Sequence, residues 1–263
     1  MVLSGLVGVI GGIAAVTLKT VVHWIQDALQ NLQGSWTQYA YVIFPLVGIV
    51  VTSWLARKVL KEKLGHGITG ILYVISKKSS IIHRVKMYSR MLTSAITVGF
   101  GGSVGLEAPI VVTGSAIGSN IGQLIHLNYK QRTLLIGCGA AAAISGIFNS
   151  PVAGVIFTVE VILTDVTIAA FIPLLIASVV GSFVSMLLLG EAVLFSFDLK
   201  DPFTASDFPY YLLLGAICGL VSVYFTRVTL WGEHLIKRIP NRIGRALLGG
   251  LALGLIIFFF HPI

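Results

Sequence analysis

The stretch GGSVGLEAP, residues Gly101–Pro109, places one carboxylate, Glu107, in the middle of a chain whose longest segments are apolar. An ionisable side chain at bilayer depth costs roughly 3 kcal/mol, so it is expected to face a polar pathway or a partner. Gly105 and the small Ala108 allow close backbone approach, and Pro109 is typical of a helix start, where free N–H groups attract anions. Glu107 is therefore the first candidate functional residue.

The composition around this stretch predicts an all-α polytopic membrane protein. Hydrophobic residues make up 56% of the 263 residues and charged residues 11%. Apolar runs such as Tyr39–Ala56 and Ile168–Leu189 carry no charge, and the ~10-residue alternation of a membrane barrel is absent from them. The net charge of +8 does not indicate a nucleic-acid partner, because the cations lie in short loops between spans. We expect a multi-pass protein embedded in a lipid bilayer, in the plasma (inner) membrane.

Hydropathy predicts long and short helices in alternation. Spanning helices are expected over residues 2–26, 39–60, 84–101, 130–147, 168–189, 210–236 and 243–260. Three apolar segments are shorter than the ~20 residues that a crossing needs, namely 67–76, 109–123 and 151–163. Short segments interrupted by Gly and Pro indicate the broken helices that form transporter sites near the bilayer midplane.

A weak internal repeat relates the first helix to a later one. Aligning Gly8 with Gly215 also aligns Gly12 with Gly219, Ile13 with Leu220, Val16 with Val223 and Trp24 with Trp231. Lys and Arg are absent from residues 21–56 after the first copy, whereas residues 237–245 after the second copy are basic. By the positive-inside bias, the first helix should end outside and the second inside, as in an inverted-topology repeat. Chance alignment of two glycine-rich helices is the competing interpretation.

Two long motifs resemble the chloride channel and chloride/proton exchanger (CLC) family. They are GGSVGLEAPIVVTGSAIG, residues 101–118, and GCGAAAAISGIFNSPVAGVIFTVEV, residues 137–161. The resemblance implies an inverted-repeat fold, with residues 1–205 as the first repeat and residues 206–263 as the first two helices of an incomplete second repeat. It also implies chloride as the transported ligand and a homodimer. No cofactor, metal site or enzymatic activity is expected, since neither a catalytic constellation nor a metal-ligand spacing occurs.

The resemblance assigns roles to particular residues. Glu107 corresponds to the family's gating glutamate, whose carboxylate occupies the anion pathway and moves or protonates to let chloride through. The family's G-S-G-I-P motif falls on GHGIT, residues 65–69. The anion-binding residues implied by the two motifs are Gly65, His66, Gly67, Ile68, Glu107, Ala108, Pro109 and Ile110.

The chain departs from the family pattern at both motifs. Leu106 replaces a basic residue, Ala108 a glycine, and Thr69 a proline. His66 stands where a serine hydroxyl normally coordinates the central anion, and its ring N–H could take over that role or leave it to backbone amides. Neither His66 nor Glu107 separates chloride from nitrate, bromide or fluoride, so anion preference stays open.

A third departure concerns protons. Exchangers of the family commonly carry a pair of acids after the F-N-x-P-x-A-G segment, the second of which transfers protons. Here Glu160 keeps the first acid and Val161 occupies the second position. Valine carries no proton, which favours a channel, although a water route or Glu160 itself would still permit exchange. Glu160 has a structural interpretation as well, in which it satisfies buried backbone groups or orients a loop.

The later pore motifs of the family, G-x-F-x-P and a pore tyrosine, have no counterpart before Ile263. We therefore expect the chain to be part of a longer polypeptide whose C-terminal half completes the pathway. A truncated half that only folds and associates is the alternative from a different functional class.

Overall fold

The computed structural model describes residues 1–32, 37–58, 60, 67–102, 104–163, 168–190, 204–239 and 242–260. These residues form helices and contain no strand. The α-helices are α1 (Val2–Leu32), α2 (Thr37–Lys58), α3 (Gly67–Lys77), α4 (Ser89–Gly99), α5 (Glu107–Leu124), α6 (Tyr129–Phe148), α7 (Pro151–Val161), α8 (Ile168–Leu189), α9 (Phe208–Lys237) and α10 (Arg242–Phe260). Two short helical turns, η2 (Arg84–Met87) and η3 (Ala205–Asp207), precede α4 and α9.

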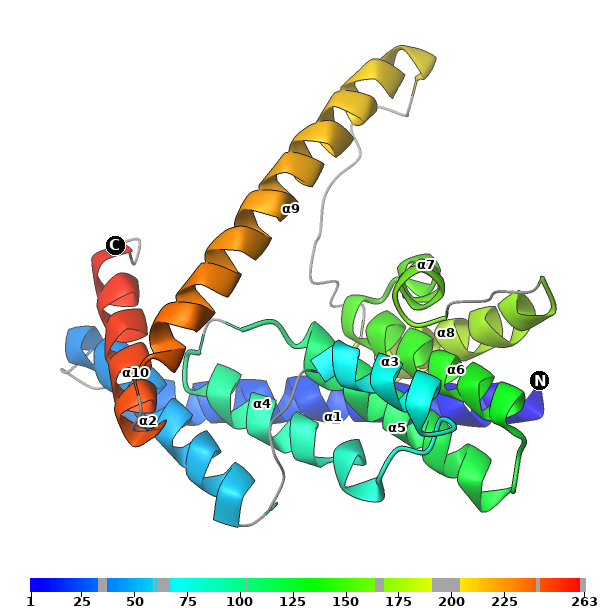
Figure 1. Cartoon of the computed structure of the whole chain (residues 1–263), viewed down its shortest axis with the longest axis horizontal. Coiled ribbons are helices and arrows are strands. Elements are labelled where there is room, and N and C mark those ends of the chain that lie inside the picture. The colour runs from blue at the N-terminus through cyan, green and yellow to red at the C-terminus, as the bar shows by residue number, and fades with distance from the viewer. Residues whose placement is uncertain are drawn as a thin grey trace.

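The bundle is organised around α6, whose residues 135–147 are all buried. α1, α5, α7 and α8 pack on α6, and α3 and α4 lie against α5 (Figure 1). All three buried apolar clusters contain residues of α6. The buried part of α6 contains a run of alanines, Ala140–Ala143, whose small side chains permit close approach by neighbouring helices.

The termini of α6 are defined by local chemistry. Asn128 caps its start, because its side-chain oxygen accepts a hydrogen bond from the Gln131 N–H at 2.9 Å. At its end Asn149 adopts a left-handed conformation with φ 51°, and Pro151 begins α7 two residues later. The short α7 therefore returns across α6 instead of continuing it.

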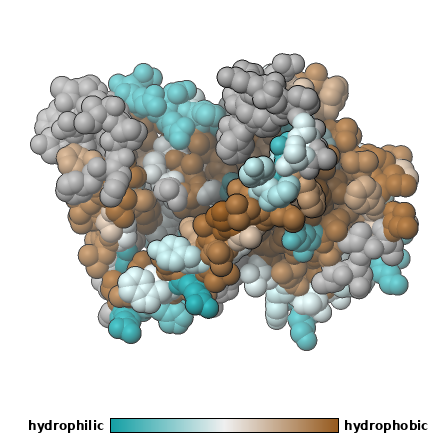
Figure 2. Space-filling model, turned by 90° about the horizontal axis from the view of Figure 1, so that it is seen from above, coloured by the Kyte–Doolittle hydropathy of each residue, from teal (hydrophilic) through white to brown (hydrophobic). Residues whose placement is uncertain are grey.

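Among the described residues, four helices are long and apolar enough to cross a membrane: Val2–Asn31, Tyr129–Phe148, Ile168–Leu189 and Phe208–Lys237. Apolar side chains cover much of the face shown in Figure 2, with hydrophilic residues mostly near its margins. An apolar exterior of this kind is expected of a protein whose solvent is lipid. The predicted short helices at 67–76 and 151–163 are confirmed as α3 and α7.

Two sequence predictions about helix limits are wrong. The span predicted at 84–101 is broken at Tyr88, where η2 ends and α4 begins, so only the 11 residues Ser89–Gly99 are α-helical. Eleven residues rise about 16 Å, half the thickness of a bilayer core. The helix predicted to start at Pro109 begins at Glu107 instead, which makes Glu107 its first residue.

Helix α9 stands apart from the bundle (Figure 1), and none of its residues is buried. α10 packs instead against α2, where the Cβ of an alanine at Gly250 would lie 2.9 Å from the Leu46 Cα. The two C-terminal helices thus touch the rest of the structure mainly through the α2–α10 pair.

Candidate functional site

The start of α5 presents backbone donors. Leu106 precedes the helix and its apolar side chain makes no capping hydrogen bond. Pro109 lies at the third helical position, where a missing N–H costs no helical bond. The Ile110 N–H donates to the Leu106 carbonyl at 3.1 Å. The amides of Glu107 and Ala108 are therefore the donors that this helix start can offer to a ligand.

Glu107 places a negative charge at the same helix start. Its side chain is exposed, and its carboxylate Oε2 lies against Gly105, where a Cβ would collide with it. Gly105 therefore allows the carboxylate to fold back toward the chain that leads into α5. A carboxylate in the first turn is favoured by the helix dipole, so the side chain acts as a resident anion there.

The start of α3 meets the start of α5. A Cβ on Gly67, the first residue of α3, would lie 3.7 Å from the Ala108 Cβ, an ordinary van der Waals contact. Both helices therefore direct the positive ends of their dipoles to one region. Two converging helix N-termini can share a dehydrated anion, since each contributes unsatisfied N–H groups.

The remaining residues predicted to bind the anion have different positions. Gly65 and His66 lie outside the described residues. Ile68 is half-buried and packs against the apolar cluster of α3, α5 and α6. Ile110 is fully buried in the core, so its side chain is excluded from contact with a ligand.

The two positions of the family's acid pair on α7 face opposite ways, with Glu160 outward and Val161 inward. Glu160 is exposed and makes no hydrogen bond or ion pair with the described part of the chain. The structural interpretation, in which Glu160 satisfies buried backbone groups, is therefore not observed. Val161 is half-buried and packs against the same cluster as Ile68 of α3. The inward position of this pair thus carries an apolar side chain.

Within the described residues, no group of three or more His, Cys, Asp or Glu is placed to hold a metal ion. Cys138 is buried and Cys218 is exposed, and both are free thiols. The described site thus offers backbone amides that can bind an anion and a carboxylate that can displace it.

Sequence reasoning missed two cations near the start of α3. Lys86 of η2 and Arg90 of α4 line a small pocket together with Gly67. The signal was present in the composition, because residues 67–106 contain Lys and Arg but no Asp or Glu. Their approach to α3 depends on packing between four elements, which no local pattern encodes.

The sequence of this chain is similar to those of known chloride transport proteins. The family model described as "Voltage gated chloride channel" matches residues 47–263. Chloride channel protein CLC-f of Arabidopsis thaliana is 28% identical over 287 residues, covering 97% of this chain and 35% of the relative. The H(+)/Cl(-) exchange transporter ClcA of Citrobacter koseri is 25% identical over 261 residues, covering 95% and 55%.

Among solved structures, a CLC-type fluoride/proton antiporter superimposes with a TM-score of 0.82 at 25% identity, covering 99% of this chain and 65% of that chain. The chain thus spans roughly a third to two thirds of the length of these proteins. The family match covers most of the chain and includes both helix starts that form the candidate site. The chain therefore belongs to the voltage-gated chloride channel (CLC) family of membrane transport proteins.

Proposed function

We propose that the full-length protein conducts chloride across a membrane along a pathway that passes the starts of α3 and α5, with Glu107 as its gate. The observation that carries this proposal is the proximity of Gly67 and Ala108, since a Cβ added to Gly67 would lie 3.7 Å from the Ala108 Cβ. This proximity brings two helix N-termini together beside the Glu107 carboxylate. Protein amides replace the hydration shell of an anion there, and helix dipoles favour its charge.

Gating follows from competition between two anions for one place. The Glu107 carboxylate and a chloride ion compete for the amides at the start of α5, because two like charges repel each other at close range. Protonation or outward rotation of the carboxylate removes that competitor. Anion flux should then increase as the carboxylate becomes protonated.

Chloride is proposed as the substrate on the strength of the relatives. The matching family model and the Arabidopsis protein are both described as chloride channels. The solved neighbour described as a fluoride/proton antiporter shows that the fold also carries fluoride. Comparing chloride with fluoride, nitrate and bromide in flux assays tests this assignment.

We further propose a channel mechanism, because the inward residue of the acid pair on α7 is Val161. A valine side chain holds no proton, so the described part of the chain offers no side-chain proton carrier at that position. The outward Glu160 faces away from the cluster that supports α3.

Chloride/proton exchange is the second candidate, supported by relatives that are described as exchangers. In that case a water route or Glu160 supplies the inner proton pathway. The test is chloride accumulation in proteoliposomes of the full-length protein under an imposed proton gradient. A channel dissipates the chloride gradient without fixed proton movement, whereas uphill chloride accumulation at a fixed ratio would replace the channel with an exchanger.

The complete pathway is proposed to require both repeats. Residues 1–205 form the first repeat, residues 206–263 open the second, and the C-terminal half of the same polypeptide supplies the rest. We also propose a homodimer, for which the exposed apolar side chains of α7, Val152 and Ile156, offer contact area. Crosslinking across α7 in native membranes tests this assembly.

A further inference from the structure

One end of the helical bundle carries cations without acids. It is formed by residues 73–87, from the end of α3 through η2, and by residues 119–133, from the end of α5 to the start of α6. These two segments contain no Asp or Glu, and their Lys and Arg residues are Lys77, Lys78, Arg84, Lys86, Lys130 and Arg132. Glu107 is the first of the 18 residues of α5, so it lies about 27 Å away, at the opposite end of that helix.

Hydrogen bonds join the end of α3 to the start of α6. The Tyr129 Oη donates to the Ile75 carbonyl at 3.1 Å, and the Arg132 Nη1 donates to the Ser79 carbonyl at 3.0 Å. Lysines lie next to both bonds, because two follow residue 75 before residue 79 and one follows residue 129 before residue 132. These three exposed side chains are named the lysine patch here: Lys77, Lys78 and Lys130.

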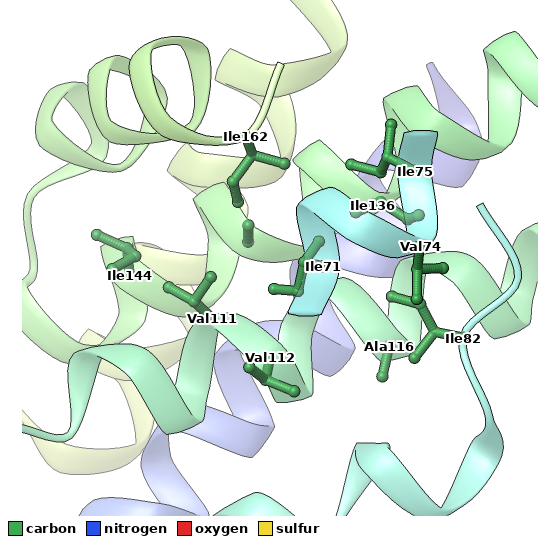
Figure 3. Packing of buried hydrophobic residues seen from close by; sticks show 11 residues of the cluster. Ile71, Val74, Ile75, Ile82, Val111, Val112, Ala116, Ile136, Ile144 and Ile162 are labelled. Atoms are coloured by element: carbon green, nitrogen blue, oxygen red, sulfur yellow. The ribbon is translucent and has the colours of Figure 1, made fainter. Parts of the chain in front are cut away.

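The turn that follows α3 is fixed by contacts with α5 and α6. Ser80 is buried in this turn, and its hydroxyl shares a hydrogen bond of 2.6 Å with the Thr133 hydroxyl. The Ser80 carbonyl accepts a hydrogen bond from the Ser119 Oγ at 2.7 Å. Figure 3 shows Ile82, just beyond the turn, near Ala116 of α5 in the same apolar cluster. A surface whose parts are fixed in this way loses little conformational freedom when it binds a partner.

The charges of the lysine patch are not neutralised by the described part of the chain. Among the described residues, no carboxylate forms an ion pair with any of the three lysines. The Lys78 Nζ lies 6.0 Å from the centre of the Tyr73 ring, which attracts the cation without cancelling its charge. Neighbouring like charges repel each other, so an anion that lies between them is stabilised.

Apolar side chains are exposed beside the same cations. Leu124 is 71% exposed at the end of α5, and Ile125, which follows it, is exposed as well. Tyr73 of α3 and Tyr129 of α6 are also exposed. Tyrosines and lysines together at helix ends are typical of the boundary between lipid tails and headgroups.

This end of the bundle lies on the face that the charge pattern predicts to be inside. A Cβ at Gly11 of α1 would lie 3.0 Å from the Ala142 Cβ of α6, and one at Gly146 would lie 2.9 Å from the Ala15 Cβ. Residue numbers increase together along this contact, so α1 and α6 run parallel. Since α1 is expected to end outside, both helices begin inside, where anionic lipids attract basic segments.

We infer that the lysine patch binds the headgroup of an acidic phospholipid of the inner leaflet, with the lipid tails against Leu124 and Ile125. A phospholipid matches both observations, because its phosphate pairs with the lysines and its tails cover the exposed apolar side chains. A free phosphate or an acidic protein segment would match the charge alone. The inference does not depend on the proposed chloride transport, since the patch lies at the end of α5 away from Glu107.

The test is lipid binding to the full-length protein in detergent, followed by native mass spectrometry with phosphatidylglycerol and phosphatidylcholine as the probes. Wild type should bind phosphatidylglycerol more tightly than phosphatidylcholine. Lys130→Gln should weaken phosphatidylglycerol binding about fivefold, the loss expected for one cation near a lipid headgroup, and the triple variant K77Q/K78Q/K130Q about a hundredfold. The variant K77R/K78R/K130R keeps the charges and should keep the preference for phosphatidylglycerol.

The matched control removes three exposed cations from other helix ends, Arg57→Gln, Lys58→Gln and Arg238→Gln, and should bind phosphatidylglycerol as wild type does. Circular dichroism should show the same helix content for all the variants, because each substituted side chain is exposed. Equal losses in the control and in K77Q/K78Q/K130Q would mean general attraction to basic residues and would overturn the inference. It is also overturned if wild type shows no preference for phosphatidylglycerol, or if Lys130→Gln binds it as tightly as wild type does.

Two competitors separate the lipid from other anions. Inorganic phosphate and an octaglutamate peptide, each added to the phosphatidylglycerol complex, should leave the lipid bound, because neither replaces the contact of its tails. Displacement by inorganic phosphate would assign the lysine patch to a free anion, and displacement by the peptide would assign it to an acidic protein segment. Either displacement would overturn the lipid inference and leave the proposed chloride transport unaffected.

Discussion

At the scale of single residues, Gly105 determines where the Glu107 carboxylate can lie. The carboxylate lies in space that a side chain at position 105 would occupy, so the glycine sets where the charge can reside. The colliding atom is the end of a flexible side chain, which can rotate away at little energetic cost. A larger residue at 105 should thus move the charge without disturbing the fold.

We expect Gly105→Ala to displace the Glu107 carboxylate and to mimic an open gate. Chloride efflux should be faster and less dependent on pH than in wild type. The free energy of unfolding should change by less than about 1 kcal/mol. Gly5→Ala is the control, because a Cβ there meets no atom within 4 Å. Wild-type pH dependence in Gly105→Ala would show that the carboxylate does not gate from this position.

Glu160 allows a second prediction at this scale. Its side chain is exposed on α7 and has no partner in the described structure, so Glu160→Gln should leave chloride flux unchanged. Under the channel proposal no proton coupling exists for the variant to lose. Simultaneous recording of chloride and pH checks this, and a coupled proton flux that disappears in Glu160→Gln while anion binding persists would assign the proton route to this side chain.

At the element scale, close glycine contacts hold α5 against α6. Gly114 and Gly118 are four residues apart on α5, a spacing typical of a helix-packing face, and both lie against α6. A Cβ at Gly114 would collide with the Gly139 carbonyl oxygen, and one at Gly118 with the Leu135 carbonyl oxygen, both on α6. Backbone atoms cannot rotate away, so these positions tolerate no side chain without moving a helix.

Gly114→Ala should therefore destabilise the protein by about 1–3 kcal/mol, the usual cost of overpacking a core. Unfolding in detergent, followed by circular dichroism, measures the change against Gly5→Ala, which should be neutral or slightly stabilising because alanine favours helix. Equal stability of the two variants would mean that α5 and α6 are not in close contact.

The helices were predictable where apolar segments are bounded by strong local signals. α3 and α7 begin at glycine or proline, so their starts follow from the local sequence alone. The end of α7 at Val161 comes two residues before the predicted end at residue 163. The break at Tyr88 was not predictable, because hydropathy averages over a turn that has no proline or glycine. The start of α5 was misplaced by two residues, since proline is tolerated anywhere in the first turn.

At the scale of the whole molecule, the two helices related by the repeat differ in their surroundings. A Cβ at Gly8 of α1 would lie 2.8 Å from the Ala177 carbonyl oxygen of α8, and one at Gly12 would lie 2.7 Å from the Gly181 carbonyl oxygen. The corresponding glycines of α9, Gly215 and Gly219, meet no atom within 4 Å. This difference is expected if α9 opens a second repeat whose partner helices lie outside residues 1–263.

The inverted repeat predicts opposite sides of the membrane for the ends of α1 and α9. Single cysteines at Gln30 and Arg238, on a background without Cys138 and Cys218, should react with an impermeant thiol reagent from opposite faces, Gln30→Cys from outside. Intact and permeabilised vesicles provide the comparison. Reaction of both cysteines from the same face would rule out inverted topology.

The candidate site was predictable only in part. Glu107 and the residues beside it are adjacent in sequence, so a single motif names them. The proximity of Gly67 and Ala108 relates positions 41 residues apart and depends on how α3 packs on α5. The Lys86 and Arg90 pocket depends on four elements at once, which is why composition signalled the cations but not their location.

Gating by Glu107 is tested by chloride efflux from proteoliposomes of the full-length protein over a series of pH values, for wild type and Glu107→Gln. Glutamine keeps the shape of a protonated glutamate and cannot ionise, so we expect efflux from Glu107→Gln to be at least as fast as from wild type and independent of pH. Glu233→Gln, which removes an exposed acid paired with Lys237 on α9, should retain the wild-type profile. A Glu107→Gln protein that keeps the pH dependence of wild type would contradict the assignment of Glu107 as the gate.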